Sequence, residues 1–322
     1  MDYRRRLGDS FSIPIKPDED GFTGRECPNP NCKGYFKIEF GTGLKGERLP
    51  CHCPYCGHTA GHDQFFTKEQ IEYAKSVAIR EITDAIHKDL KKMEFHHKPR
   101  GAFGIGISLK VEPGRPMPIR YYREKQLETE VVCASCTLRY SVYGVFAFCP
   151  DCGQHNSLQI LDKNLEVVGK MLDLAAIAEK EVAQRIIENA LEDCVSAFDG
   201  FAREICRVYR ENAANPSRVD RLSFQDLERA KSTVLGMFGV DLSAYLSPDE
   251  WQWAVRAFQK RHLIAHKMGV VDQQYIARSN DTQAVVGRKI GIGADEVRGL
   301  LQIISKLARG LSNDLGEGGR HP

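Results

Sequence analysis

Residues 133–153 read CASCTLRYSVYGVFAFCPDCG and carry two pairs of cysteines, each pair spaced by two residues. This spacing lets a tight turn direct both sulfurs at one ion, and Gly153 after the second pair tolerates the positive φ that the turn needs. Residues 137–144, between the pairs, have the pattern of a strand and a turn. The stretch therefore predicts a zinc ribbon whose four ligands are Cys133, Cys136, Cys149 and Cys152.

A second cysteine group lies earlier in the chain and ends in a similar knuckle, CPYCG, at residues 53–57. Cys51 makes the choice of ligand less certain here, because either it or Cys53 can complete the set. His58 and His62 are further possible ligands, although an exposed polar loop is the commoner setting for such histidines. The predicted ligands of this first zinc site are Cys27, Cys32, Cys53 and Cys56.

The chemistry of four cysteine ligands indicates the role of both zinc ions. A disulfide framework is the competing interpretation of the eleven cysteines, but the chain is 322 residues long and shows no export signal. Four thiolates leave no open position for water or substrate, so both sites are predicted to be structural. Their expected task is to fold small β units that lack enough core to fold alone.

Zinc ribbons also serve as docking surfaces for nucleic acids or proteins, and their aromatic residues can stack on bases. The alternative, which we favour, is that these side chains pack the ribbons themselves. The candidate stacking residues are Tyr35, Phe36, Phe40, Tyr140, Tyr143 and Phe146.

Helical patterns complete the domain organisation. Thr67 and Gln70 match a capping box, and an apolar stripe at helical spacing follows, so a helix is predicted to run to about Phe95. The stripe consists of Ile71, Ala74, Ala78, Ile82, Ile86 and Leu90. The predicted fold is multidomain, with two small β zinc ribbons joined by a helix and followed by an all-α bundle. The segments are a flexible N-terminal arm (1–25), ribbon 1 (26–65), the connecting helix (66–98), ribbon 2 (99–162), the helical domain (163–312) and a disordered tail (313–322).

One helix of the predicted bundle carries a group of polar residues. Ser247 is its N-cap and Gly269 its stop signal. Trp251, Val255 and Phe258 form its inward stripe, and His262 and His266 are predicted to continue that stripe in steps of four. With Arg261 beside them, these histidines require either a satisfied internal network or a lined cleft.

This segment resembles the Arg-x4–6-His signature of HEPN domains, which are small helical bundles of prokaryotic toxins, anti-phage systems and RNA-processing factors. Arg261-x4-His266 is followed by GVVD at residues 269–272, and VVGRKI at residues 285–290 precedes a final helix predicted over 294–311. The residue after the arginine is often Asn in that family, and His262 departs from this while keeping the polarity. The resemblance covers roughly residues 165–312, fused to the two N-terminal zinc ribbons.

The resemblance implies a metal-independent endoribonuclease with a toxin or anti-phage defence role. His266 would take the proton of a ribose 2′-OH, Arg261 would neutralise charge developing on the phosphate, and His262 completes the site. It also implies a homodimer through the helical domain, with RNA as substrate and the ribbons recognising RNA, a protein partner or a trigger. The alternative is a non-catalytic zinc-ribbon protein that binds or senses nucleic acid, or a scaffold, dimerised by an inactive HEPN domain.

The overall charge restricts how RNA can be bound. The net charge is +2 with thiols counted as neutral, and each zinc held by four thiolates adds 2 − 4 = −2. Bulk charge therefore gives no support to broad nucleic-acid binding, which must come from local patches. No apolar run approaches the ~20 residues that cross a bilayer, and no apolar stretch follows the basic N-terminus. We expect a cytoplasmic protein without membrane contact.

Overall fold

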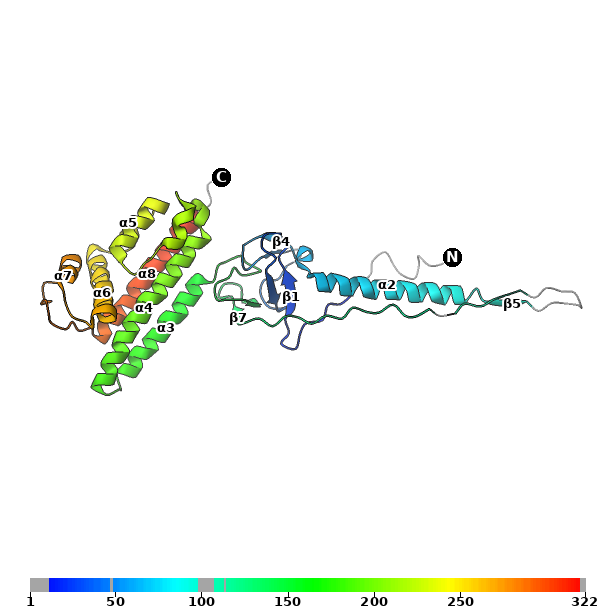
Figure 1. Ribbon diagram of the computed structural model, residues 1–322, viewed down its shortest axis with the longest axis horizontal. Helices are drawn as coiled ribbons and strands as arrows, with labels where there is room; N and C mark the ends of the chain where they lie inside the picture. The colour runs from blue at the N-terminus through cyan, green and yellow to red at the C-terminus, as the bar shows by residue number, and fades with distance from the viewer. Residues whose placement is uncertain (1–11, 47–48, 98–106, 113, 319–322) are drawn as a thin grey trace, which may run out of the picture. The chain divides into compact units, whose positions relative to one another are not determined.

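The computed structural model describes residues 12–46, 49–97, 107–112 and 114–318. The chain divides into an N-terminal unit, residues 1–154, and a C-terminal unit, residues 155–322 (Figure 1). Small antiparallel sheets belong to the first unit and most of the helices to the second, as predicted. The predicted flexible arm lies outside the described residues as far as residue 11.

The two predicted ribbons share one antiparallel sheet instead of forming separate units. Its strand order is β1-β2-β8-β7, and the central pairing aligns Ile38 of β2 with Tyr140 of β8. Two further two-stranded sheets pair β3 with β4 and β5 with β6. The strands are β1 (Thr23–Glu26), β2 (Tyr35–Ile38), β3 (Pro50–His52), β4 (Thr59–Gly61), β5 (Phe95–His97), β6 (Ile107–Leu109), β7 (Thr129–Val132) and β8 (Arg139–Val142).

A single small core lies beneath this shared sheet. Phe36 and Ile38 from the first ribbon pack with Leu138, Tyr140 and Val142 from the second, and most of the clustered cysteines lie in the same core. Neither ribbon contributes enough apolar side chains for a core of its own, so pairing β2 with β8 lets the two halves share one.

The helix α2 (Lys68–Lys91) belongs to the same unit and follows a short 3-10 turn, η1 (His62–Phe65). Its predicted capping box is confirmed, because the Gln70 amide donates to Thr67 Oγ1 at 3.1 Å and the Thr67 amide donates to Gln70 Oε1 at 3.2 Å. The helix ends at Lys91, before the predicted end at about Phe95, where β5 begins. The apolar stripe that periodicity predicts is present, but it lies on an exposed face.

The C-terminal unit is helical, and its described residues contain no strand. α3 and α4 lie side by side along α8 around one apolar core, which includes Phe198, Phe258 and Leu307 (Figure 1). The predicted final helix over 294–311 continues to Gly318, so residues 313–318 of the predicted disordered tail are helical. The helices are α3 (Ser157–Ala175), α4 (Lys180–Val208), α5 (Leu227–Phe238), α6 (Pro248–Lys267), α7 (Gln273–Ser279) and α8 (Ala294–Gly318), with 3-10 turns η2 (Arg210–Asn212), η3 (Pro216–Arg221) and η4 (Leu242–Tyr245).

The cap of α6 is built as predicted. Ser247 accepts from the Glu250 amide and Glu250 reaches back to the Ser247 amide, with Pro248 at the first helical position. Within the described part of the chain, no helix is both long enough and apolar enough to cross a membrane.

Candidate functional site

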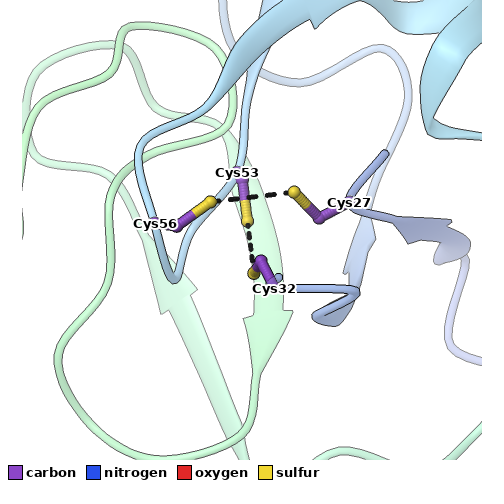
Figure 2. A group of neighbouring side chains, drawn as sticks. All are labelled: Cys27, Cys32, Cys53 and Cys56. Carbon is purple, nitrogen blue, oxygen red and sulfur yellow. Dashed lines mark hydrogen bonds between the residues drawn. The ribbon is translucent and has the colours of Figure 1, made fainter. Parts of the chain in front are cut away.

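The first cysteine cluster brings together the four predicted ligands (Figure 2). The Sγ atoms of Cys27 and Cys56 are 3.7 Å apart, and those of Cys32 and Cys53 are also 3.7 Å apart. Cys27 directly follows β1, whereas Cys53 directly follows β3. The site therefore ties together two strands that do not pair with each other.

The second cluster is built in the same way from the second ribbon. The Sγ atoms of Cys133 and Cys152 are 3.7 Å apart, and those of Cys136 and Cys149 are 3.4 Å apart. Within each cluster all four sulfurs lie within 4.8 Å of one another. Tetrahedral coordination with Zn–S bonds of about 2.3 Å requires sulfurs about 3.8 Å apart, so both clusters fit a four-coordinate zinc ion.

Tight turns hold the sulfurs in these positions. The Gly57 amide donates to the Cys53 carbonyl, and the Gly153 amide donates to the Cys149 carbonyl, each at 2.9 Å. Both glycines have positive φ, +68° and +69°, as their place after the CPxC knuckles predicts. In the knuckle that begins at Cys133, Thr137 takes the equivalent left-handed conformation with φ +64°.

Burial makes the thiolate form of two of these cysteines unfavourable without a positive partner. Removal from water raises the pKa of Cys27 to about 11 and that of Cys136 to about 11, because a thiolate without a positive partner is poorly solvated there. A bound divalent cation supplies the missing positive charge and deprotonates coordinating thiols. Four sulfurs close the coordination sphere, so the chemistry available at either site is structural.

The structure places Cys53, and not Cys51, in the first cysteine cluster. Cys51 lies in β3, is fully buried and belongs to neither cluster, and burial raises its pKa to about 12. His58 and His62 are also outside both clusters, where each approaches an aromatic ring instead.

The candidate stacking residues divide into buried and exposed groups. Tyr35, Phe36 and Tyr140 are core residues, in agreement with the favoured packing role, whereas Phe40 remains 57% exposed. One face of Phe40 meets the buried guanidinium of Arg25 at 4.9 Å. Phe40 also lines a cavity of about 700 Å³, together with Ile38, Glu39, Leu44, His62, Asp63, Leu138 and Asp151.

The polar group on α6 differs from its prediction. His262 and His266 are exposed and their ring centroids are 5.0 Å apart, whereas Arg261 is only 7% exposed. The predicted continuation of the inward stripe through both histidines is therefore wrong. At about 100° per residue, His262 lies only about 20° from Trp251 around the helix axis and His266 about 60° from it, so both keep the general direction of the stripe. They are exposed because the described residues do not cover this side of α6 near its end.

Arg261 is held by neighbouring elements. It donates from Nη1 to Gln225 Oε1 at 3.2 Å, and its Nη2 lies 3.5 Å from Glu192 Oε1 on α4. These contacts hold the guanidinium against α4 and the segment before α5. Arg261 thus does not share the exposed surface of the two imidazoles.

Several cationic groups surround the imidazole of His262. Partial burial lowers the pKa of His262, and the charges of His266, Lys267, Arg261 and Arg278 lower it further. Because the pKa falls below its usual value of about 6.5, His262 is neutral at pH 7. Lys267 pairs with Asp272 and Arg278 pairs with Asp226. Sequence reasoning did not single out Arg278, because it lies twelve positions after His266, beyond the turn that ends α6.

The segments that carry the family resemblance meet in space. The Ile290 amide donates to the Gly269 carbonyl at 2.8 Å, and the Val271 amide donates to the Arg288 carbonyl at 2.9 Å. Gly269 has φ +78° and follows the left-handed Met268 that ends α6, so its predicted role as the stop signal is confirmed. The turn fixes the exposed end of α6 against the segment before α8.

Searches of protein-family models, curated proteins and solved structures found no match to this chain.

Proposed function

We propose that the protein cleaves RNA without a catalytic metal ion, at the exposed end of α6, as an endoribonuclease of HEPN type. The observation that carries this proposal is the adjacent pair of exposed imidazoles, His262 and His266, with ring centroids 5.0 Å apart. Two imidazoles at this spacing supply a general base and a general acid from one copy of the chain.

The lowered pKa of His262 favours the role of general base for this histidine, which leaves the role of general acid to His266. Neutral His262 takes the proton of a ribose 2′-OH, and the 2′ oxygen attacks the adjacent phosphorus. His266, the neighbouring imidazole, acts as the general acid and gives a proton to the departing 5′ oxygen as the P–O5′ bond breaks. The products are a 2′,3′-cyclic phosphate and a 5′-hydroxyl, and no water enters this step.

Basic side chains next to the histidines favour a phosphate at this position. Lys267 and Arg278 are partly exposed and act on the same imidazole, and their acidic partners are partly exposed as well, so a phosphodiester can exchange with those carboxylates. Arg261, which is buried, acts as a positioning residue that fixes α6 and adds positive potential near His262.

We further propose that both cysteine clusters hold Zn²⁺ and that the N-terminal unit recognises RNA or a partner. The sulfur spacings and the closed sets of four ligands support structural zinc. The exposed ring of Phe40, backed by Arg25 and bordering the cavity, supports base stacking. This surface is also the observation that favours the second candidate function, non-catalytic RNA binding.

The decisive experiment incubates end-labelled tRNA and mRNA with the full-length protein and with His262→Ala and His266→Ala variants. Met268→Ala is the matched control, because Met268 is highly exposed just beyond the same helix end. We expect wild type and Met268→Ala to cleave, leaving cyclic phosphate ends, and both histidine variants to lose at least about 100-fold in rate. Parallel reactions with and without EDTA separate contaminating metal-dependent nucleases from loss of zinc.

The binding function predicts a different outcome. RNA then remains intact under all conditions, its binding weakens with salt, and Phe40→Ala reduces affinity while His266→Ala has no effect. Cleavage that survives in both histidine variants would refute the assignment of the site to α6.

A further inference from the structure

Helix α2 exposes an apolar stripe along most of its length. Within this helix of 24 residues only Gln70 is buried. The stripe residues are 41–47% exposed and comprise Ile71, Ile79, Ile82, Ile86 and Leu90. Met93, 63% exposed, extends the stripe just beyond the end of the helix. An exposed row of this length is typical of a surface that packs against another helix.

Described residues of the segment after β6 pack on the other side of α2. The Arg120 amide donates to Ser76 Oγ at 3.0 Å, and the ring of Tyr73 lies 5.7 Å from that of Tyr122. Tyr73 precedes Ile82 by nine residues, which at about 100° per residue places it on the opposite face of the helix. The described part of the returning segment, residues 107–112 and 114–128, therefore leaves the apolar stripe open. A helix in a protein gains most of its stability from packing its apolar face against another element. We therefore expect the stripe of α2 to bind a partner.

The charged residues within the stripe identify that partner. Between residues 71 and 93, Lys75 and Asp89 are the only charged residues within about 40° of Ile82 on the helix surface. They lie at equal distances from it, since 82 − 75 = 7 and 89 − 82 = 7. An antiparallel copy of α2 centred on Ile82 therefore places each Lys75 beside Asp89 of the second copy.

The apolar residues obey the same symmetry. In this register Ile71 meets Met93, Ala78 meets Ile86, and Ile82 meets its own equivalent. A parallel pairing in register would instead place Lys75 beside Lys75 and Asp89 beside Asp89, so that like charges would face each other within the apolar seam. Asp89 already pairs with Lys92 of its own helix at 2.7 Å, but both side chains are exposed and can exchange partners.

We propose that α2 is the surface through which a second copy of this chain binds, as an antiparallel helix pair centred on Ile82. The overlap from Ile71 to Met93 spans about 33 Å at a rise of about 1.5 Å per residue. This contact is independent of any dimer formed by the C-terminal unit and of the proposed cleavage at α6.

Charge exchange tests the register in the full-length protein. In sedimentation equilibrium, Lys75→Glu and Asp89→Lys are each expected to weaken self-association through α2 by about tenfold or more, because each faces a like charge in the second copy. The double variant restores the pairing with reversed signs and is expected to lie within about threefold of wild type. Equal association in all four proteins would overturn the proposal.

Cysteine cross-linking tests whether the two copies of α2 pair antiparallel or parallel, and it reports on α2 alone. Under mild oxidation with diamide, Ile82→Cys should join two copies, and a mixture of Ile71→Cys and Met93→Cys should cross-link although neither does so alone. The matched controls are wild type, with its native cysteines, and Asp84→Cys on the opposite face. Cross-linking of Ile71→Cys to itself would show parallel pairing. Absence of the Ile82→Cys product would show that α2 does not bind a second copy.

Discussion

His155 makes the stability of the C-terminal unit depend on pH in a calculable way. Its ring is buried at the start of α3, where Nδ1 accepts a hydrogen bond from the Ser157 amide at 3.3 Å. Burial lowers the pKa of His155 to about 4, although the carboxylate of Glu204 lies 3.8 Å from Nε2. An accepting Nδ1 must be unprotonated, so the hydrogen bond favours the same direction.

The sign of the effect follows from the two pKa values. Between pH 6.5 and pH 4 the unfolded chain binds a proton at His155 and the folded chain does not, so stability falls as the pH falls. With these values the loss between pH 7.5 and pH 5.0 is about 2 kcal/mol, since one pKa unit corresponds to about 1.4 kcal/mol.

Urea unfolding followed by tryptophan fluorescence measures this loss selectively, because both tryptophans, Trp251 and Trp253, lie in the C-terminal unit. Any loss of metal from the N-terminal unit at pH 5.0 therefore does not enter the signal directly. His155→Asn keeps an acceptor but cannot be protonated, so its stability should fall by about 2 kcal/mol less than wild type over the same pH range. An equal loss in the two proteins would refute the reasoning.

Three further predictions concern the metal sites and the packing. Cys53→Ser should reduce bound metal from two ions to one by elemental analysis, whereas Cys51→Ser, outside both clusters, should retain two. Phe198→Ala removes a ring that packs edge-on against two others in the core, and should lower the urea-derived stability of the C-terminal unit by about 3–5 kcal/mol. Ser247→Ala should cost about 1 kcal/mol in the same assay because the Glu250 amide loses its acceptor, and Ser247→Asp should restore most of it.

Local signals in the sequence predicted the parts of the fold that depend on neighbouring residues. The cysteine knuckles and the capping boxes that begin at Thr67 and Ser247 are encoded within a few positions, and each is present. The pairing of β2 with β8 was not predicted, because about 100 residues separate these strands and each pairing contact is made by the backbone. The pairing is favoured because β2 and β8 bury their apolar side chains in one core. The spacing of apolar residues along the sequence does not show which strands share a core.

Periodicity also misled where it was used to infer burial. A stripe at helical spacing shows that a helix has an apolar face, but it does not show that the same chain covers that face. In α6 the stripe through Phe258 is buried, but His262 and His266, which continue in nearly the same direction, are exposed because the described residues do not cover that side of the helix near its end. In α2 the stripe around Ile82 exists as predicted and nothing among the described residues covers it.

The base of α2 connects this open stripe to the metal sites. Gln70 donates from Nε2 to the Gly24 carbonyl at 2.9 Å and to Glu124 Oε1 at 3.1 Å, and Tyr35 of β2 donates to the same carboxylate at 2.5 Å. Cys27 follows β1 directly, so the strand that holds Gln70 also presents one sulfur of the first cysteine cluster. A bound ion that fixes Cys27 therefore also fixes the strand from which α2 projects. The shared sheet thereby provides a rigid base for α2, which a core as small as that of a single ribbon would not supply.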